Sequence, residues 1–418
     1  MPGVRPIRAP GFFDLDGAMQ SLTTLFLVIM VLTVVGYFLA KSRALQVSGG
    51  DSRTLVSLPR QHGLNASLAT LVPPLAAMLL IALYLRLSGA QGSWLLGLLI
   101  IALSVTGLAL SLIGIKTETR ARTLAERWIM GLLIFASTVA ILTTVGIVFS
   151  MLFETFHFFE QYDWKEFFFS TTWSPNFRGD SDLGIIPLLW GTLYISFIAL
   201  AFSVPIGLFA AIYLSEYAGP RMRSVAKPAI EILAGIPTIV YGLFALITVG
   251  PMLRDYFAQP LGFGDSASSV MTAGLVMGVM LIPFVSSLSD DIINAVPQAM
   301  RDGSLGLGAT KSETIRQVII PAALPGIVGA VLLAASRAIG ETMIVVLGAG
   351  AAARLSLNPF EAMTTVTVKI VSQLTGDTDF GSPETLVAFA LGLTLFVITL
   401  GLNVLALYIV RKYREQYE

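Results

Sequence analysis

Two residues of opposite charge, Arg337 and Glu341, stand inside an apolar run near 323–350. An ionisable side chain at membrane depth costs about 2.5–3.5 kcal/mol on insertion scales, so it is rare without a role. Residues four apart share one face of a helix, and a structural ion pair is one explanation. An anion site is the other, because the planar arginine fork matches phosphate oxygens bidentately, with the glutamate tempering the positive charge so that the anion can leave.

A polar connector at 296–325 is the second stretch with chemical potential. It starts near a proline, predicts a short helix, breaks at glycines and resumes as an amphipathic helix leading to Pro321. Gly303 and Gly308, with Lys311 following, resemble the start of a nucleotide-binding P-loop. That motif requires lysine directly after the second glycine, on a turn leaving a β-strand. Here two residues intervene and no strand precedes, so we expect no ATP site in this chain.

Other kinds of site find no support in the composition. The chain contains no cysteine, which excludes disulfides and thiolate metal sites. His62 and His157 are far apart, and no HExxH pair exists. The formal net charge of zero gives no support for nucleic-acid binding. We therefore expect no catalytic residue, no metal site and no nucleic-acid partner.

The elements that position the two stretches are apolar runs. Hydrophobic residues make up 55% of the chain and charged residues 12%, against about 25% charged in soluble domains. A membrane-spanning helix needs about 20 apolar residues. Nine runs satisfy this, which predicts an all-α polytopic membrane protein with helices near 20–40, 68–85, 94–115, 128–153, 186–213, 229–252, 270–288, 323–350 and 385–410.

The runs form two groups. Residues 1–127 hold three predicted helices and a polar linker, and residues 128–418 hold six helices and the polar connector. We expect the glycines and prolines inside the runs to serve close helix packing and kinks rather than chemistry; they include Pro205, Pro237, Pro283, Gly274 and Gly278.

Lysine and arginine in the loops predict the orientation, because they concentrate on the cytoplasmic side. With the C-terminus inside, seventeen basic residues fall in the cytoplasmic segments and eight on the other side. The cytoplasmic segments are 41–67, 116–127, 214–228, 289–322 and 411–418. The loops at 154–185 and 351–384 then lie outside.

An aromatic-rich loop at 153–177 belongs to the outer side. Trp and Tyr concentrate at the level of the lipid headgroups, which favours an interfacial helix. A docking platform for an extracytoplasmic partner is the alternative, and both can hold.

The polar connector resembles the cytoplasmic loop of ABC-importer permeases, whose pattern is Glu-Ala-Ala, three residues, Gly, nine residues, then Ile-x-Leu-Pro. The matching positions are Asp302, Gly303 and Ser304, then Gly308, then Pro321. The spacing is kept, while Asp replaces Glu and Gly-Ser replaces Ala-Ala. The resemblance implies a short coupling helix that docks into a groove of the ATPase subunit, and an acidic residue near its N-terminus would stabilise it.

The run from Arg337 to Met343, Arg-Ala-Ile-Gly-Glu-Thr-Met, resembles the phosphate-specific ABC permeases of the C type (PstC). Further matches lie at 191–197, 213–218 and 231–242, and the similarity covers about 128–415. It implies a six-helix, type I permease core in the bacterial inner membrane, preceded by about three extra N-terminal helices. Arg337 and Glu341 would then line the translocation pathway for inorganic phosphate.

The resemblance also implies partners. They are a homologous second permease, two copies of a cytoplasmic ATPase that bind ATP and Mg²⁺, and an extracytoplasmic phosphate-binding protein, with lipid around the helices. The chain itself would bind no cofactor and would not be an enzyme. Two alternatives stay open: an ABC permease for another oxyanion, and an ion-coupled secondary transporter or channel, although such transporters usually carry inverted repeats and none is visible here.

The orientation can be tested by cysteine labelling, since the chain has no cysteine of its own. We expect Ser312→Cys, in the predicted cytoplasmic segment 289–322, to react with a membrane-impermeant thiol reagent only after the membrane is opened. Labelling of intact cells from outside would reverse the assigned orientation.

Overall fold

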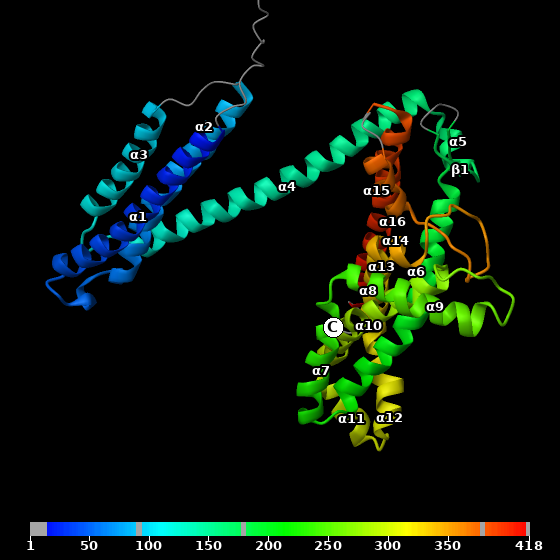
Figure 1. Ribbon diagram of the computed structural model, residues 1–418. Coiled ribbons are helices and arrows are strands. Elements are labelled where there is room, and N and C mark those ends of the chain that lie inside the picture. Colours follow the sequence, from blue (N-terminus) through cyan, green and yellow to red (C-terminus); the bar gives the residue numbers. More distant parts are fainter. Residues whose placement is uncertain (1–14, 89–93, 177–180, 377–380, 415–418) are drawn as a thin grey trace, which may run out of the picture. The chain divides into compact units, whose positions relative to one another are not determined.

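The structure is a computed structural model that describes residues 15–88, 94–176, 181–376 and 381–414 (Figure 1). The ends of the predicted terminal segments, 1–14 and 415–418, lie outside the described residues, as do parts of three loops. The chain forms two compact units, Met1–Thr144 and Val145–Glu418. Each unit is described by itself.

The first unit is a bundle of long helices. It contains α1 (Leu15–Val47), the 3₁₀ turn η1 (Ser52–Thr54), α2 (Pro59–Ser88), α3 (Trp94–Ile113) and the first part of α4 (Ala121–Gln161). The helices α1, α2 and α3 lie side by side (Figure 1). Gly107 explains how closely α3 approaches α2, because a Cβ atom at that position would overlap the carbonyl oxygen of Ala69.

The predicted domain boundary between residues 127 and 128 falls inside α4, as does the division between the two compact units. This helix has 41 residues, about twice the length that a bilayer core requires. One helix therefore carries the chain from the first unit into the second, and the exact boundary stays a prediction.

In the second unit, the last part of α4 is followed by α5 (Trp164–Phe169). A small antiparallel pair of strands comes next, β1 (Trp173–Ser174) and β2 (Asp182–Leu183). In their register Trp173 faces Leu183 and Ser174 faces Asp182. The long helices of this unit are α6 (Ile186–Ile212), α10 (Val270–Ala295), α13 (Ile320–Ile339) and α16 (Pro383–Arg414).

Shorter helices and π-helical turns connect them. Between α6 and α10 lie η2 (Tyr213–Tyr217), α7 (Pro220–Ala234), α8 (Thr238–Phe244), η3 (Ala245–Val249), α9 (Gly250–Leu253) and η4 (Arg254–Ala258). Between α10 and α16 lie α11 (Gln298–Gly306), α12 (Lys311–Thr314), η5 (Ile315–Ile319), α14 (Met343–Gly348) and α15 (Val366–Gly376).

The pair α6 and α10 forms the centre of this unit. A Cβ atom at Gly274 would stand 2.7 Å from Cγ2 of Ile198, and one at Gly278 would stand 2.9 Å from Cδ1 of Phe202. Both distances are shorter than non-bonded carbons tolerate, so only glycine permits this approach. The prediction that these two glycines serve close helix packing is confirmed.

Nine helices within the described residues are long and apolar enough to cross a membrane, which is the number predicted. Most of them bury a third or less of their apolar window, whereas Val270–Ala295 buries 67%. Helices that face lipid expose apolar side chains, because hydrocarbon is as apolar as the side chains themselves. The pattern identifies α10 as the central helix of the second unit.

Some predicted limits are wrong: the run at 68–85 lies within the longer helix Pro59–Ser88, and the run at 128–153 lies within Ala121–Gln161. Two other predicted spans are divided in the structure. The run at 229–252 is divided, because α7 ends before Gly235 and α8 begins after Pro237. Proline has no N–H to donate and disfavours helix at the residue before it, so the spanning helix is Thr238–Ala258. The run at 323–350 is divided as well, because α13 ends at Ile339 and α14 begins at Met343.

Part of the aromatic-rich loop forms a core of its own. Phe158 and Phe167 are fully buried against Leu183 and Leu391, and their ring centroids are 5.6 Å apart in an edge-to-face arrangement. Other members of the loop, such as Phe153, are exposed. The buried rings of the aromatic-rich loop therefore serve internal packing. For its exposed rings, a place at the membrane interface and the docking of a partner stay predictions.

The glycine contact between α6 and α10 generates a stability prediction. Gly274→Val should destabilise the protein by about 1–3 kcal/mol, the usual cost of overpacking, as measured by denaturant unfolding in detergent. Gly401→Val is the matched control, because a Cβ atom at Gly401 on α16 would meet no other atom within 4 Å. Equal stability of the two variants would contradict the packing account.

Candidate coupling and translocation site

The polar connector folds as its sequence predicts. The helix α11 starts after Pro297 and ends at Gly306. Gly308 follows with φ of +90°, a conformation that side-chain-bearing residues rarely adopt. Thr310 then caps α12 in a reciprocal capping box with Glu313. The short helix, the glycine break and the resumed helix are therefore confirmed.

The five connector residues that the resemblance singled out take different positions. Asp302 lies in the middle of α11 and accepts a hydrogen bond from Nε2 of Gln298 at 3.0 Å. The expectation that it stabilises the helix N-terminus is wrong, because the first turn contains no acidic residue. Ser304 pairs with Thr314 through their hydroxyls at 2.9 Å. Pro321 stands in the first turn of α13, and Gly303 is open to its surroundings.

The exposed side of α11 is apolar in part. No residue of α11 is buried, and Leu305 and Leu307 are 48% and 91% exposed. Figure 1 shows α7, α11 and α12 at one end of the second unit. Leu305 lies in α11, and Leu307 is its C-cap residue. Both expose apolar surface outside the membrane-spanning helices, and exposed apolar surface is typical of a site that binds another protein.

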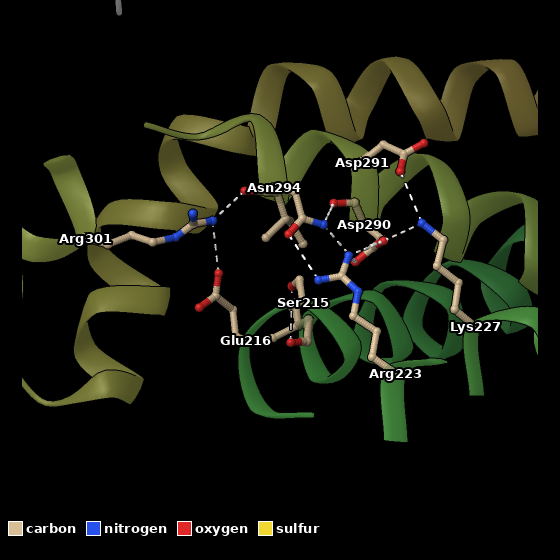
Figure 2. Close-up of polar contacts among 10 residues, drawn as sticks. Ser215, Glu216, Arg223, Lys227, Asp290, Asp291, Asn294 and Arg301 are labelled. Atoms are coloured by element: carbon tan, nitrogen blue, oxygen red, sulfur yellow. Dashed lines mark hydrogen bonds and ion pairs between the residues drawn. The ribbon is translucent and has the colours of Figure 1, made fainter. Parts of the chain in front are cut away.

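A buried carboxylate joins α7 to α10 near this end (Figure 2). Asp290 is 1% exposed, and its Oδ1 and Oδ2 accept hydrogen bonds from Nη2 of Arg223 at 3.0 and 2.9 Å. Lys227 donates to Oδ2 of Asp290 at 2.8 Å, and Asn294 donates to Oδ1 at 3.0 Å. The hydrogen bond to Asp290 raises the pKa of Lys227. Hydrogen bonds among these four side chains therefore join α7 to α10, and α7 itself contributes no buried residue to the contact.

Sequence reasoning did not identify this cluster. The partners are separated by more than 60 residues, so their pairing depends on how α7 folds back on α10. One local signal was available: Asp290 and Asp291 end an apolar run, and Arg223 and Lys227 stand four apart on an amphipathic helix. Complementary charges at helix spacing indicate facing surfaces.

The prediction that Arg337 and Glu341 share one face of a single helix is wrong. Because α13 ends at Ile339, with Gly340 as its cap, Glu341 lies beyond the helix. Its Oε1 accepts hydrogen bonds from the backbone N–H groups of Met343 at 3.0 Å and Ile344 at 3.4 Å. The carboxylate therefore satisfies the first turn of α14, where the helix dipole favours negative charge.

Arg337 has no anionic partner among the described ion pairs. Its guanidinium carbon stands 5.9 Å from the ring centroid of Phe284 on α10, a cation–π distance. The residue is exposed on α13. The structure thus brings Arg337 and Glu341 near the same helix end without pairing them, and a guanidinium without an anion partner can bind an anion.

The described residues contain no cluster of acidic, histidine or cysteine side chains that could hold a metal ion.

Comparison with known proteins gives the family. Residues 203–415 match the family described as binding-protein-dependent transport system inner membrane components. The chain belongs to this family. Members are membrane components of importers, not enzymes, so ATP hydrolysis belongs to a separate subunit. The chain is accordingly a multi-pass inner-membrane protein.

The N-terminal helices match a further family. Residues 26–91, which cover most of α1 and α2, match a family described as phosphate ATP-binding cassette transporter. Part of the N-terminal region is thus similar to a segment found in phosphate ATP-binding cassette transporters.

Several relatives are similar over most of their own length. The probable ABC transporter permease protein YqgH of Bacillus subtilis is 33% identical over 234 residues. The aligned region covers 56% of this chain and 74% of YqgH. The phosphate transport system permease protein PstC of Mesorhizobium japonicum is 32% identical, covering 59% and 78%. The protein PstC 1 of Mycobacterium tuberculosis is 35% identical, covering 59% and 81%.

The backbone at Gly308 generates a prediction for the permease. Gly308→Val should abolish transport while the protein still inserts, because a β-branched residue at φ of +90° is strained. Gly308→Asn should retain part of the transport, since asparagine tolerates positive φ better. Substrate uptake by cells carrying each variant, normalised to the amount in the membrane, provides the measurement. Equal uptake by the two variants would show that backbone conformation at Gly308 is irrelevant.

Proposed function

We propose that this chain is the transmembrane permease subunit of an ATP-binding-cassette importer for inorganic phosphate. Family membership supports the importer class, and the match of residues 26–91 to phosphate transporters supports the substrate. The observation that carries the proposal is Arg337, an exposed arginine on the membrane-spanning helix α13. It lies over Phe284 of the central helix α10 and has no anion partner among the described ion pairs. The chain forms the translocation pathway and couples to a separate ATPase.

Arg337 is the anion contact in this proposal. A guanidinium offers two parallel N–H donors to two phosphate oxygens. Glu341 moderates the site without pairing with Arg337, because its carboxylate is held at the start of α14. Its negative charge lowers the local positive potential without competing for the guanidinium. An anion can then bind and leave.

The partners follow from the same reading. A homologous second permease would complete the pathway, and two copies of a cytoplasmic ATPase would hold ATP and Mg²⁺, so this chain binds no cofactor. The exposed leucines of α11 support docking of the ATPase there, with Asp302, Gly303, Ser304 and Gly308 in the coupling loop. An extracytoplasmic phosphate-binding protein would deliver the substrate. The C-terminus then lies in the cytoplasm.

A different oxyanion is the nearest competing substrate. Sulfate and molybdate present oxygen edges that a guanidinium binds equally well, so Arg337 alone does not select among them. Phosphate is favoured by two of the three relatives described above, which are named phosphate transport permeases, and by the N-terminal match.

Substitutions at Arg337 test the anion contact. Arg337→Ala should remove phosphate uptake while the importer complex still assembles, and Arg337→Lys should restore only part of it, because an ammonium is a point charge without the fork. Arg86→Ala, at an exposed arginine near the end of α2, is the matched control and should transport normally. Radiolabelled phosphate uptake and co-purification of the ATPase are measured on the same cells.

A second substitution distinguishes the anion site from a purely structural role. The guanidinium of Arg337 lies over the ring of Phe284, and methionine keeps a favourable contact with an aromatic ring. If Arg337 only stabilises the fold through this contact, Arg337→Met should transport phosphate efficiently. The proposal predicts no uptake by Arg337→Met, and efficient uptake by it would end the assignment.

A further inference from the structure

Arg301 joins the coupling helix α11 to two other elements (Figure 2). Its Nη2 donates to the carbonyl oxygen of Ile293 at 2.6 Å, and its Nη1 donates to that of Val296 at 3.3 Å. The same Nη2 lies 3.1 Å from Oε1 of Glu216. Ile293 and Val296 belong to the C-terminal end of α10, and Glu216 lies in η2, which continues α6. One guanidinium therefore links α11 to two other elements, α10 and η2.

The chemistry of these contacts explains why the residue is arginine. The last carbonyls of a helix have no partner within the helix and carry partial negative charge, and the guanidinium has several donors in one rigid plane. The side chains of Arg301 and Glu216 are 14% and 11% exposed, so solvent screens the ion pair little. A lysine has a single nitrogen and would not reach both carbonyls and the carboxylate in the same geometry.

The other contacts of α11 are apolar or stay within the connector. Met300 packs against a buried apolar cluster that includes Ile293 and Ile315. No residue of α11 is buried, and Ser304 bonds only to Thr314 on the following helix. The bond between Gln298 and Asp302 stays within α11. Among the hydrogen bonds and ion pairs of the described residues, those of Arg301 are the ones that tie a side chain of α11 to α10 and η2.

We propose that Arg301 is the positioning residue that transmits a displacement of α11 to the membrane-spanning helices α6 and α10. The inference rests on the proposed function, in which the ATPase docks on α11. With the guanidinium in place, α11 moves together with the ends of both helices. Without it, α11 shifts against them and the motion is lost before it reaches the pathway.

The coupling ratio, phosphate transported per ATP hydrolysed, is the quantity that tests this role. The full chain is reconstituted in vesicles with its permease, ATPase and binding-protein partners, and both activities are measured on one sample. Arg301→Met should keep ATP hydrolysis and lower the ratio by about tenfold, within the range found for residues that couple sites. Arg301→Lys should give an intermediate ratio. Arg316→Met is the matched control, because Arg316 is exposed on η5, and its ratio should not change.

Two further variants separate the guanidinium contacts from a simple ion pair. Glu216→Gln removes one charge with little change of shape and should lower the ratio less than Arg301→Met. The charge exchange Glu216→Arg with Arg301→Glu restores an ion pair but removes the guanidinium from the carbonyl oxygens of Ile293 and Val296. We expect the exchange not to restore coupling, and a wild-type ratio in the exchanged protein would overturn the role of the carbonyl contacts.

The remaining outcomes are distinguishable from one another. If uptake and ATP hydrolysis fall in proportion in both Arg301→Met and Glu216→Gln, leaving the ratio unchanged, Arg301 serves only stability or assembly and the inference is wrong. If the wild-type complex itself shows no ATP-driven phosphate uptake, the proposed function fails, whatever the variants do.

Discussion

The hydrocarbon interior of a membrane offers no hydrogen-bond partner to a backbone N–H or C=O group, and this constraint determines the form of the whole chain. Only helices satisfy those groups within one segment, and the described residues contain nine helices long and apolar enough to cross. Where a spanning run is interrupted, at Pro237 or Gly340, a new helix begins within a few residues. Glu341 shows how the interruption is satisfied, because its carboxylate accepts the first N–H groups of α14.

The same constraint concentrates charge at helix ends. Asp290 is buried, yet two cations and an amide surround it, since an unpaired buried charge is costly. Arg301 and Glu216 form the second such contact, at the C-terminal end of α10. Both clusters stand where α7 and α11 meet the membrane-spanning helices. Arg337 lies apart from both clusters, over Phe284 of the central helix α10 and without an anion partner among the described ion pairs, which is why it carries the functional proposal.

The sequence predicts most of the fold and only part of the site. Apolar runs identify nine spans, and Pro297 and Gly308 identify the limits of α11, because each reflects a local backbone preference. The end of α13 was missed, because glycine is tolerated inside membrane-spanning helices, and Gly340 therefore did not indicate a helix end. The partners of Asp290 and Arg301 were missed for another reason: their contacts join residues far apart in the chain, and helix periodicity says nothing about which faces meet.

The central claim is that this permease moves phosphate when ATP is hydrolysed by a partner. Vesicles containing the full complex, with ATP sealed on the ATPase side and the binding protein on the other, measure it most directly. The account predicts uptake of radiolabelled phosphate that requires ATP hydrolysis, is competed by unlabelled phosphate and is unaffected by equal concentrations of sulfate or molybdate. Uptake that proceeds without ATP, or that sulfate or molybdate suppresses as well as phosphate does, would contradict it.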